Sequence, residues 1–505
     1  MGFNQRFPRT VLLLGFLSGF FIAGTLRADV TLPAVFGDHM VLQQGTTLPV
    51  WGKASPGEYV RVMIGGHSAG TMADASGKWR VTLRPLATSL APQNLLIEGK
   101  NRIEIQDVLL GDVWICAGEG NMKFPLADAA GGKDSPGATT DRQLRFFISG
   151  EHAGLQPDHQ GAGKWVVCNE ESAPSFSAVG YFFARELRSA RHLPIGIIQC
   201  TLDDSPAQAW ISREALQLPP SFSACLAAQA SALSSASLPK PTNQKAPSAV
   251  FNGMVNPLIP YAMTGVIWYQ GESNDGLAAL EYRRLFPRLI RDWRKRWGEG
   301  AFPFFFVLPA GYGVEDGPEV EPFYGINGHP RRGLPWLREG LICALTLPNA
   351  GMAAATDLGV TDDRFPPDKL DVGRRLALLA RKRVYGEDLV DAGPAYRGMH
   401  LEAGKLRVQF DSVGSGLTLG APPSEGEDAT RLISTRLKGF ALAGKDGKWF
   451  PATGKIEGAS VLLSSDAVPQ PEAVRYNWKG FPGGNLYNRE GLPASPFRTD
   501  IRQPD

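Results

Sequence analysis

The sequence has little net charge and few cysteines, and each shortage excludes a class of protein. Its 52 basic and 50 acidic residues give a formal net charge of +2, so no positive field is available to attract nucleic acid. Its five cysteines are an odd number without a closely spaced pair, which argues against a dense disulfide framework and a zinc site. We therefore expect buried free thiols, and no metal or other cofactor.

Long hydrophobic runs are absent after the first 28 residues. Arg6 and Arg9 precede an apolar run over residues 11–24, and residues 26–28 (LRA) offer a cleavage point, so residues 1–28 are predicted to be a signal peptide. The run is short for a membrane span of about 20 residues. We expect an exported protein, periplasmic or extracellular, without a stable membrane span once the signal is removed.

The chain of 505 residues is long enough for two or three domains, and its 58 glycines and 39 prolines indicate many turns. Residues 29–107 alternate apolar and polar positions in short runs between turns, as in residues 59–64 (YVRVMI), which predicts a β domain. Residues 391–505 return to this texture and are predicted to be a C-terminal β region that packs with the N-terminal one.

Residues 108–390 instead alternate apolar strands with amphipathic helices. Continuous apolar strands joined by helices predict a parallel sheet covered on both faces. Residues 217–248, rich in Ser, Ala and Pro, are predicted to be a loosely ordered connection within this domain. The predicted strands are residues 113–116, 195–202, 265–269, 304–308 and 352–356, and the predicted helices are residues 178–191, 280–297 and 370–385.

Polar loops follow these strands, and in a parallel sheet such loops meet at the carboxyl ends of the strands. The loops are residues 118–122 (GEGNM), 201–210 (TLDDSPAQAW), 270–274 (QGESN), and Asp357 with 362–366 (DDRFP).

Several long blocks resemble the sialate O-acetylesterase family of SGNH hydrolases: residues 37–43 (GDHMVLQ), 265–274 (GVIWYQGESN), 484–488 (GNLYN) and 491–498 (GLPASPFR). The resemblance covers nearly the whole mature chain. It implies a flavodoxin-like α/β/α domain with a parallel sheet, flanked by N- and C-terminal β-sandwich-like segments. It also implies a serine esterase that removes O-acetyl groups from sugars, with a histidine base steered by an aspartate.

The sequence departs from the family pattern at the residues that carry this chemistry. The family's turn resembles Gly-Gln-Ser-Asn, and here Gly120 stands at the nucleophile's position. The family's last block resembles Asp-Asp-Ile-His-Pro, and here Phe365 replaces the base, with Asp362 or Asp363 as the residual acid. The second block, Trp-Gly-Gly-Thr-Pro-Ala in the family, has Asp203 and Asp204 in place of its glycines.

Without a nucleophile and a base, the covalent route is closed. We therefore predict a pseudoenzyme that binds a glycan, O-acetylated or acidic, without cleaving it. The alternative is an active esterase that uses Ser205, Ser273 or His329 as substitutes. The residues predicted to form the substrate or oxyanion pocket are Glu119, Asn121, Asp203, Asp204, Gln270, Gly271, Glu272, Asn274 and Trp210.

Three of the replacements are acidic, and with the other carboxylates of these loops they predict an acidic rim around the site, with Lys123 and Arg364 neutralising part of it. The predicted rim consists of Glu119, Asp203, Asp204, Glu272 and Asp362 or Asp363. Three interpretations of this rim stay open: drift on a solvated surface, which we favour, a Ca²⁺ or sugar site, and an acid–base pair acting on a glycosidic bond. Trp210 and Phe124 are candidate platforms for stacking against a sugar.

Overall fold

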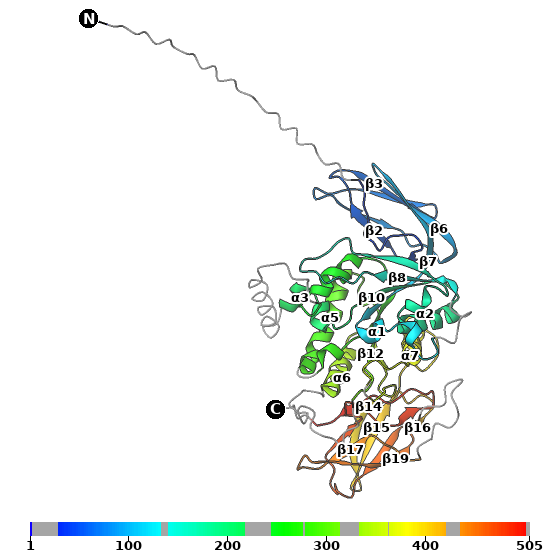
Figure 1. Cartoon of the computed structure of the whole chain (residues 1–505). Helices are drawn as coiled ribbons and strands as arrows, with labels where there is room; N and C mark the ends of the chain where they lie inside the picture. Colours follow the sequence, from blue (N-terminus) through cyan, green and yellow to red (C-terminus); the bar gives the residue numbers. More distant parts are fainter. Residues whose placement is uncertain are drawn as a thin grey trace.

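The computed structural model describes residues 1–2, 29–132, 140–217, 244–275, 278–313, 333–361, 363–420 and 435–500 (Figure 1). An N-terminal β part, a central α/β part and a C-terminal β part follow one another along the molecule. The two β parts lie at opposite ends, so the prediction that they pack together was wrong. Residues 3–28 of the predicted signal peptide and 218–243 of the predicted connection lie outside the described residues.

The N-terminal part consists of strands that pair antiparallel, except for β1, and its strands β3 and β5 alternate side chains between core and solvent. In β5, Trp79 and Val81 are buried whereas Lys78 and Arg80 are exposed, which is the period-two pattern of a strand with one face in the core. Its strands are β1 (Val41–Gln43), β2 (Leu48–Lys53), β3 (Tyr59–Ile64), β4 (His67–Met72), β5 (Lys78–Leu83) and β6 (Ser89–Glu98).

One long strand, β7 (Arg102–Gly118), joins the first two parts. Its first half pairs with β1 and β6, and its second half is a central strand of the α/β sheet. The backbone passes close to Pro194 at Gly111, where any Cβ would meet the Pro194 carbonyl oxygen. The sequence pattern changes near residue 108, from alternating β segments to apolar strands with amphipathic helices. This change therefore falls within the continuous strand β7.

The central sheet has the strand order β13-β12-β11-β7-β10-β8-β9, and every neighbouring pair is parallel except β8 and β9. β11 and β12 have the predicted bounds, whereas β13 lies two residues before the predicted strand. The strands are β8 (Asp141–Ser149), β9 (Gly163–Cys168), β10 (Ile195–Thr201), β11 (Gly265–Tyr269), β12 (Phe304–Leu308) and β13 (Ala350–Ala354).

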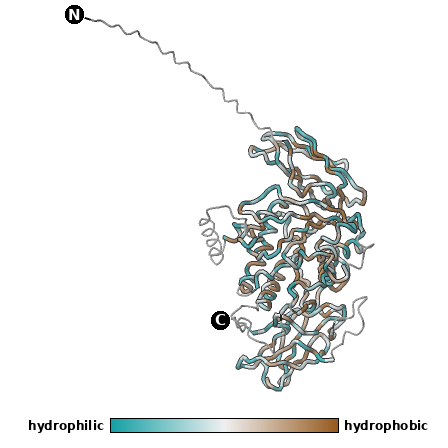
Figure 2. The backbone as a smooth tube through the Cα atoms, viewed as in Figure 1, coloured by the Kyte–Doolittle hydropathy of each residue, from teal (hydrophilic) through white to brown (hydrophobic). Residues whose placement is uncertain are grey.

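Helices cover both faces of this sheet, which confirms the expected doubly covered arrangement (Figure 1). α2 (Ala178–Arg191) and α7 (Leu370–Arg383) pack on one face, and α3 (Arg213–Gln217), α5 (Ala279–Trp297) and α6 (Leu334–Ile342) lie on the other. Successive strand residues enter opposite cores: Trp268 packs on the α5 side and Tyr269 on the α2 side. Figure 2, in which the backbone is coloured by the hydropathy of each residue, shows the hydrophobic residues concentrated between these layers.

Cys116, Cys168 and Cys200 are buried free thiols, as the sequence predicts, and Cys343 is partly exposed. Cys225 lies outside the described residues. Within the described ranges, no helix has both the length and the apolar character needed to cross a membrane.

The C-terminal part has its own hydrophobic core between small antiparallel sheets. One sheet contains β14 (Ala395–Glu402), β15 (Lys405–Asp411), β20 (Ser460–Ser464) and β19 (Thr453–Glu457). Another contains β18 (Trp449–Pro451), β17 (Phe440–Ala443), β21 (Ala473–Tyr476) and β23 (Phe497–Arg498). The third pairs β16 (Leu417–Leu419) with β22 (Leu486–Asn488).

A buried ion pair links the central and C-terminal parts. Asp357, which follows β13, receives two hydrogen bonds from the Arg375 guanidinium of α7, at 2.7 and 2.8 Å. The Tyr487 hydroxyl of β22 donates to the same carboxylate at 3.1 Å. Asp357 is thus a structural residue, held away from solvent by groups from both parts.

Removing the cation from this pair should destabilise the protein. In Arg375→Met the buried Asp357 carboxylate loses its counter-charge, a change that costs about 3–5 kcal/mol of unfolding free energy. Arg374→Met, on the exposed side of the same helix, is the matched control and should change stability by less than about 0.5 kcal/mol. Urea denaturation of both variants measures the difference, and equal midpoints would contradict the assignment.

Candidate functional site

The loops after β7, β10 and β11 meet at the carboxyl edge of the sheet, as the sequence predicts. Gly118 ends β7 and lies beside both Thr201 of β10 and Tyr269 of β11. Backbone hydrogen bonds continue past the strands, from Glu119 N to Tyr269 O at 3.1 Å and from Leu202 N to Gly118 O at 3.0 Å. The strand ends lead directly into α1 (Gly120–Lys123), η3 (Ala207–Trp210) and η6 (Glu272–Asn274).

Gly120 and Phe365, which the sequence predicts at the positions of the family's nucleophile and base, lie against one another. Gly120 begins α1, and a Cβ placed on it would overlap the ring of Phe365. The ring is 37% exposed, so it covers Gly120 while presenting part of its surface to solvent. Asp363 supports this arrangement because its Oδ1 accepts a hydrogen bond from Phe365 N at 2.7 Å. An aromatic ring therefore occupies the space beside Gly120 that a side chain there would need.

Glu119 is buried and surrounded by donors rather than facing a solvated rim. Its Oε1 accepts hydrogen bonds from Gly271 N at 3.0 Å, Ser273 N at 2.9 Å and Gln270 Nε2 at 3.2 Å. The Ser273 hydroxyl donates to the other carboxylate oxygen. Glu119 consequently fastens the turn after β7 to the loop after β11, and the Ser273 hydroxyl is committed to it.

The loop after β10 is held by a second set of buried hydrogen bonds. Asn274 Oδ1 accepts from Ala207 N at 2.7 Å and from Gln270 Nε2 at 3.0 Å. Ser205, which is fully buried, donates its hydroxyl to Leu202 O and accepts from Trp210 Nε1 at 3.0 Å. This hydroxyl closes a turn and points at no accessible space.

Trp210 requires a correction. It is fully buried and packs edge-to-face on Trp268, with ring centroids 5.3 Å apart, so it presents no face to a sugar. The physical reason is that η3 turns this side chain into the core on the α5 side of the sheet. Phe124, the other candidate platform, lies under the Lys369 ammonium, 4.7 Å from the ring centroid.

A buried network contains Lys369, which the sequence analysis missed. Lys369 Nζ donates to Asn121 Oδ1 at 2.7 Å and to the Pro366 carbonyl, and so ties α1 to the block that carries Phe365. Asn121 Nδ2 in turn donates to Glu272 Oε1 and, at 3.0 Å, to Arg364 O. The sequence offered one signal for this residue, a lysine four residues after Phe365 and just before an amphipathic helix. The signal was not sufficient, because the burial of Lys369 depends on tertiary packing.

Burial dominates the electrostatics of this network. It raises the pKa of Glu272 to about 8, helped by the nearby Glu119 carboxylate, and it lowers the pKa of Lys369 to about 8. Glu272 Oε2 has no hydrogen-bond partner among the residues the structure describes.

The predicted acidic rim is also corrected. Glu119 and Glu272 are buried in the crevice, whereas Asp203 and Asp204 are exposed and paired with lysines: Asp203 with Lys123 at 3.1 Å and Asp204 with Lys245 at 2.7 Å. Asp204 has a φ of 54°, in the left-handed region that favours glycine. The carboxylates therefore point in different directions.

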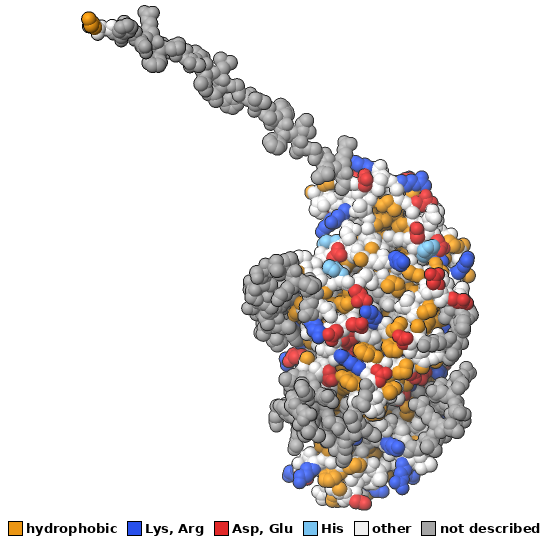
Figure 3. Space-filling view, viewed as in Figure 1, with side chains coloured by type: hydrophobic (Ala, Val, Ile, Leu, Met, Phe, Trp, Pro, Cys, Tyr) orange, Lys and Arg blue, Asp and Glu red, His pale blue; other side chains and the backbone are white. Residues whose placement is uncertain are grey.

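Figure 3 shows acidic and basic side chains interspersed over this central part. Lys123 also pairs with Glu151 at 2.8 Å, which fits its predicted neutralising role. Within the described ranges, no group of three or more His, Cys, Asp or Glu side chains could hold a metal ion. Asp362 and His329 lie outside the described residues.

Comparisons with known proteins agree with this architecture, although no family model matches the chain. Human sialate O-acetylesterase is 29% identical over 91% of this chain and 90% of its own length, and the mouse protein is 26% identical over 92% and 93%. A solved carbohydrate acetylesterase from Xanthomonas citri is 36% identical, with a TM-score of 0.80 over 94% of this chain and all of that one.

The α/β sheet with its strand-end loops, and these similarities over nearly the whole length, define a carbohydrate esterase-type protein. Within that class, the chain belongs to the sialate O-acetylesterase-like family of carbohydrate esterases.

The raised pKa of Glu272 predicts a pH-dependent stability. Between pH 4.5, the ordinary pKa, and about pH 8, the folded chain retains a proton that the unfolded chain releases, so the free energy of unfolding falls as the pH rises. Glu272→Gln removes this contribution and should be more stable relative to the parent at pH 8 than at pH 5. Denaturation curves across this range test the sign.

Glu281→Gln, at an exposed position of α5, is the control and should keep the parent's slope. If the free energies of unfolding of Glu272→Gln and the parent changed in parallel from pH 5 to pH 8, Glu272 would not be the protonated group.

Proposed function

We propose that this protein is a non-catalytic member of its family, which binds an O-acetylated or acidic glycan at the strand-end site without releasing acetate. We also propose that it is exported through its N-terminal signal peptide, and that its central part is a flavodoxin-like SGNH domain. The strand order supports the last point: with β8 and β9 set aside, β7, β10, β11, β12 and β13 have the order 2-1-3-4-5.

The observation that carries the proposal is the contact between Gly120 and Phe365. Acyl transfer by a serine esterase needs a hydroxyl at the first position and a proton acceptor at the second, because a serine hydroxyl is a weak nucleophile at its own pKa. Neither residue can supply its part, and the ring fills the intervening space. The two replacements fit each other sterically, so a change at only one of them does not recreate the site.

The substitutes are poorly suited to restore catalysis. Ser205 is fully buried and bonded to Leu202 and Trp210, and the Ser273 hydroxyl is bonded to Glu119. The alternative in which an acid–base pair cleaves a glycosidic bond requires two carboxyl groups that face the same bond. Glu119, however, is enclosed by donors of its own loops. The exposed Phe365 and Asp203, with the partly exposed Arg364, are suited to binding.

Truncating the exposed aromatic ring should weaken glycan binding. We expect Phe365→Ala to lower affinity for O-acetylated glycans on an array at least tenfold, while the parent binds them and releases no acetate. Leu401→Ala is the matched control, because Leu401 is 62% exposed in the C-terminal part, far from the site. Acetate release by the parent, or unchanged binding by Phe365→Ala, would refute the proposal.

Restoring both lost groups together should restore chemistry. In Gly120→Ser the new side chain overlaps Phe365, so this single variant should be destabilised and inactive. We expect Gly120→Ser/Phe365→His to hydrolyse p-nitrophenyl acetate at least about 10²-fold faster than Gly120→Ala/Phe365→His, since a positioned general base contributes about 10²–10⁴-fold.

The alanine control has the same packing without the hydroxyl, so it isolates nucleophilic attack. Equal rates in the two double variants would show that the donors around the second block cannot stabilise an oxyanion, and adding Asp204→Gly would then test that block directly.

A further inference from the structure

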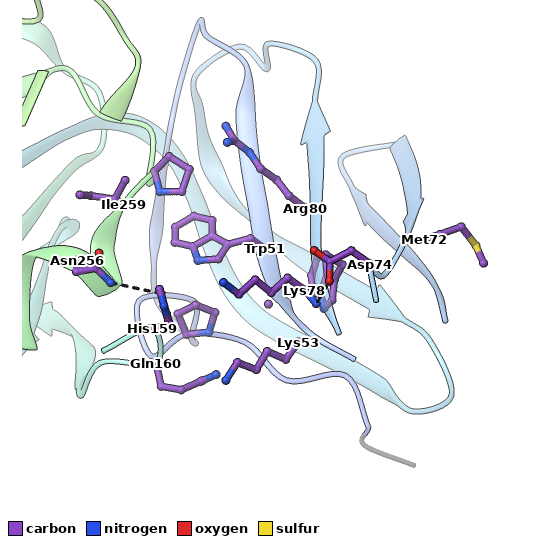
Figure 4. Close-up of a pocket in the computed structure, with 14 residues that line it drawn as sticks. Trp51, Lys53, Met72, Asp74, Lys78, Arg80, His159, Gln160, Asn256 and Ile259 are labelled. Atoms are coloured by element: carbon purple, nitrogen blue, oxygen red, sulfur yellow. Dashed lines mark hydrogen bonds between the residues drawn. The ribbon is translucent and has the colours of Figure 1, made fainter. Parts of the chain in front are cut away.

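A cavity lies away from the strand-end site, between the N-terminal β part and the central part (Figure 4). Its volume is about 320 Å³, within the range of small-molecule pockets. One wall comes from β2 and β5, and the other from residues 159–160, 256 and 259–260. All of these residues are described by the structure.

The wall from β2 and β5 collects positive charge on one face. In the antiparallel pairing, Lys53 lies directly opposite Lys78, and Trp51 opposite Arg80. Because side chains two residues apart share a face of a strand, these four side chains lie on the same face. The other face carries Val50, Trp79 and Val81, which are buried in the core. Like charges directly opposite each other destabilise a sheet, so folding stability does not account for this arrangement.

Among the residues that the structure describes, no salt bridge includes Lys53, Lys78 or Arg80, although Asp74 lies near Lys78 and Glu299 near Arg80. One carboxylate, Asp74, also lines the cavity. Its Oδ1, however, accepts hydrogen bonds from Ser76 N at 2.8 Å, the Ser76 hydroxyl at 2.7 Å and Lys78 N at 3.0 Å, and so holds the turn before β5. The lining therefore contains three cationic side chains and one carboxylate, so its own side chains carry a net positive charge; Glu299, outside the lining, acts on Arg80 alone.

The opposite wall is polar and close enough to sense this charge. Partial burial lowers the pKa of His159, and the positive charges of Lys78 and Lys53 lower it further. His159 Nδ1 lies 3.3 Å from Asn256 Nδ2, and Gln160 adds a second amide, as Figure 4 shows. Imidazole and amide groups of this kind both donate and accept hydrogen bonds.

An aromatic surface completes the cavity. Trp51 is partly exposed and is held edge-to-face by Phe36, with ring centroids 4.7 Å apart. In Figure 4 its indole lies between the basic side chains and the wall that carries Ile259. A flat apolar surface beside ammonium groups and amides matches a ligand with an apolar face, an anionic group and hydroxyls.

We propose that this cavity binds a carboxylate-bearing sugar unit of an acidic glycan, independently of the strand-end site. The lysines and Arg80 bind the carboxylate, Trp51 packs against the ring, and Gln160 and Asn256 bond the hydroxyls. The ligand's negative charge offsets the repulsion between Lys53 and Lys78.

Calorimetric titration of the full chain with tetragalacturonate tests this proposal. We expect binding that is at least tenfold weaker for the uncharged methyl ester of the same oligosaccharide, and at least tenfold weaker in Lys53→Gln/Lys78→Gln. The control, Lys405→Gln/Lys448→Gln, removes the same charge from exposed positions in the C-terminal part and should bind as the parent does. No binding by the parent, or equal affinity for acid and ester, would overturn the proposal.

Two further measurements separate the alternatives. The Lys53→Gln/Lys78→Gln variant should melt at or above the parent's temperature, since it removes a like-charge pair, so lost binding cannot be attributed to unfolding. Inorganic phosphate that competes as well as tetragalacturonate at equal ionic strength would indicate a general anion site and overturn the sugar assignment.

The Phe365→Ala variant distinguishes binding at this cavity from binding at the strand-end site. It should bind tetragalacturonate at this cavity as the parent does. If Phe365→Ala abolished that binding and the lysine variant retained it, the inference would fail while the proposed function stood.

Discussion

A carboxylate can remain inside a protein only when donors surround it, and Glu119 satisfies that condition at the point where the central strands end. Two backbone amides, a hydroxyl and the Gln270 amide converge on it. All of these donors belong to the loop after β11, whereas Glu119 belongs to the turn after β7. These hydrogen bonds therefore join two loops that the sheet alone would only bring near each other.

This constraint explains how the loops of the site are held in place. Glu119 holds the loop that carries Gln270 and Asn274, and Asn274 in turn holds the loop after β10 through Ala207 N. Lys369 and Asn121 join the block of Phe365 to α1 from the other side. The framework is thus built from buried polar contacts that do not involve Gly120, so a glycine at that position does not loosen it.

The same reasoning separates two kinds of acidic replacement that look alike in sequence. Glu119 is stabilised by donors in the interior, whereas Asp203 and Asp204 stay in solvent and are paired with lysines, an interaction that contributes little to stability when exposed. One replacement is therefore part of the architecture, and the others belong to a mixed-charge surface. An aspartate at residue 204 is tolerated because the left-handed region is open to Asp more than to most residues.

Much of the fold could be predicted because hydrophobic periodicity is local. β3, β11, β12 and α2 have the predicted bounds, and the parallel, doubly covered sheet follows from apolar strands alternating with amphipathic helices. β13 was displaced by two residues because Ala-rich segments carry no strong period. The prediction that the N- and C-terminal β parts pack together was wrong because a similar alternation of apolar and polar residues contains no information about which surfaces touch.

The sequence by itself determined which loops meet, since this follows from the order of strands and loops along the chain. The resemblance to the family predicted that Gly120 and Phe365 stand where a nucleophile and a base are expected. Only the tertiary structure decided that Phe365 covers Gly120, that Trp210 faces the core, that Lys369 is buried and that four basic or aromatic side chains of β2 and β5 face a cavity. Those outcomes depend on the direction of each side chain and on contacts between residues far apart in the chain, and neither is encoded in a local pattern.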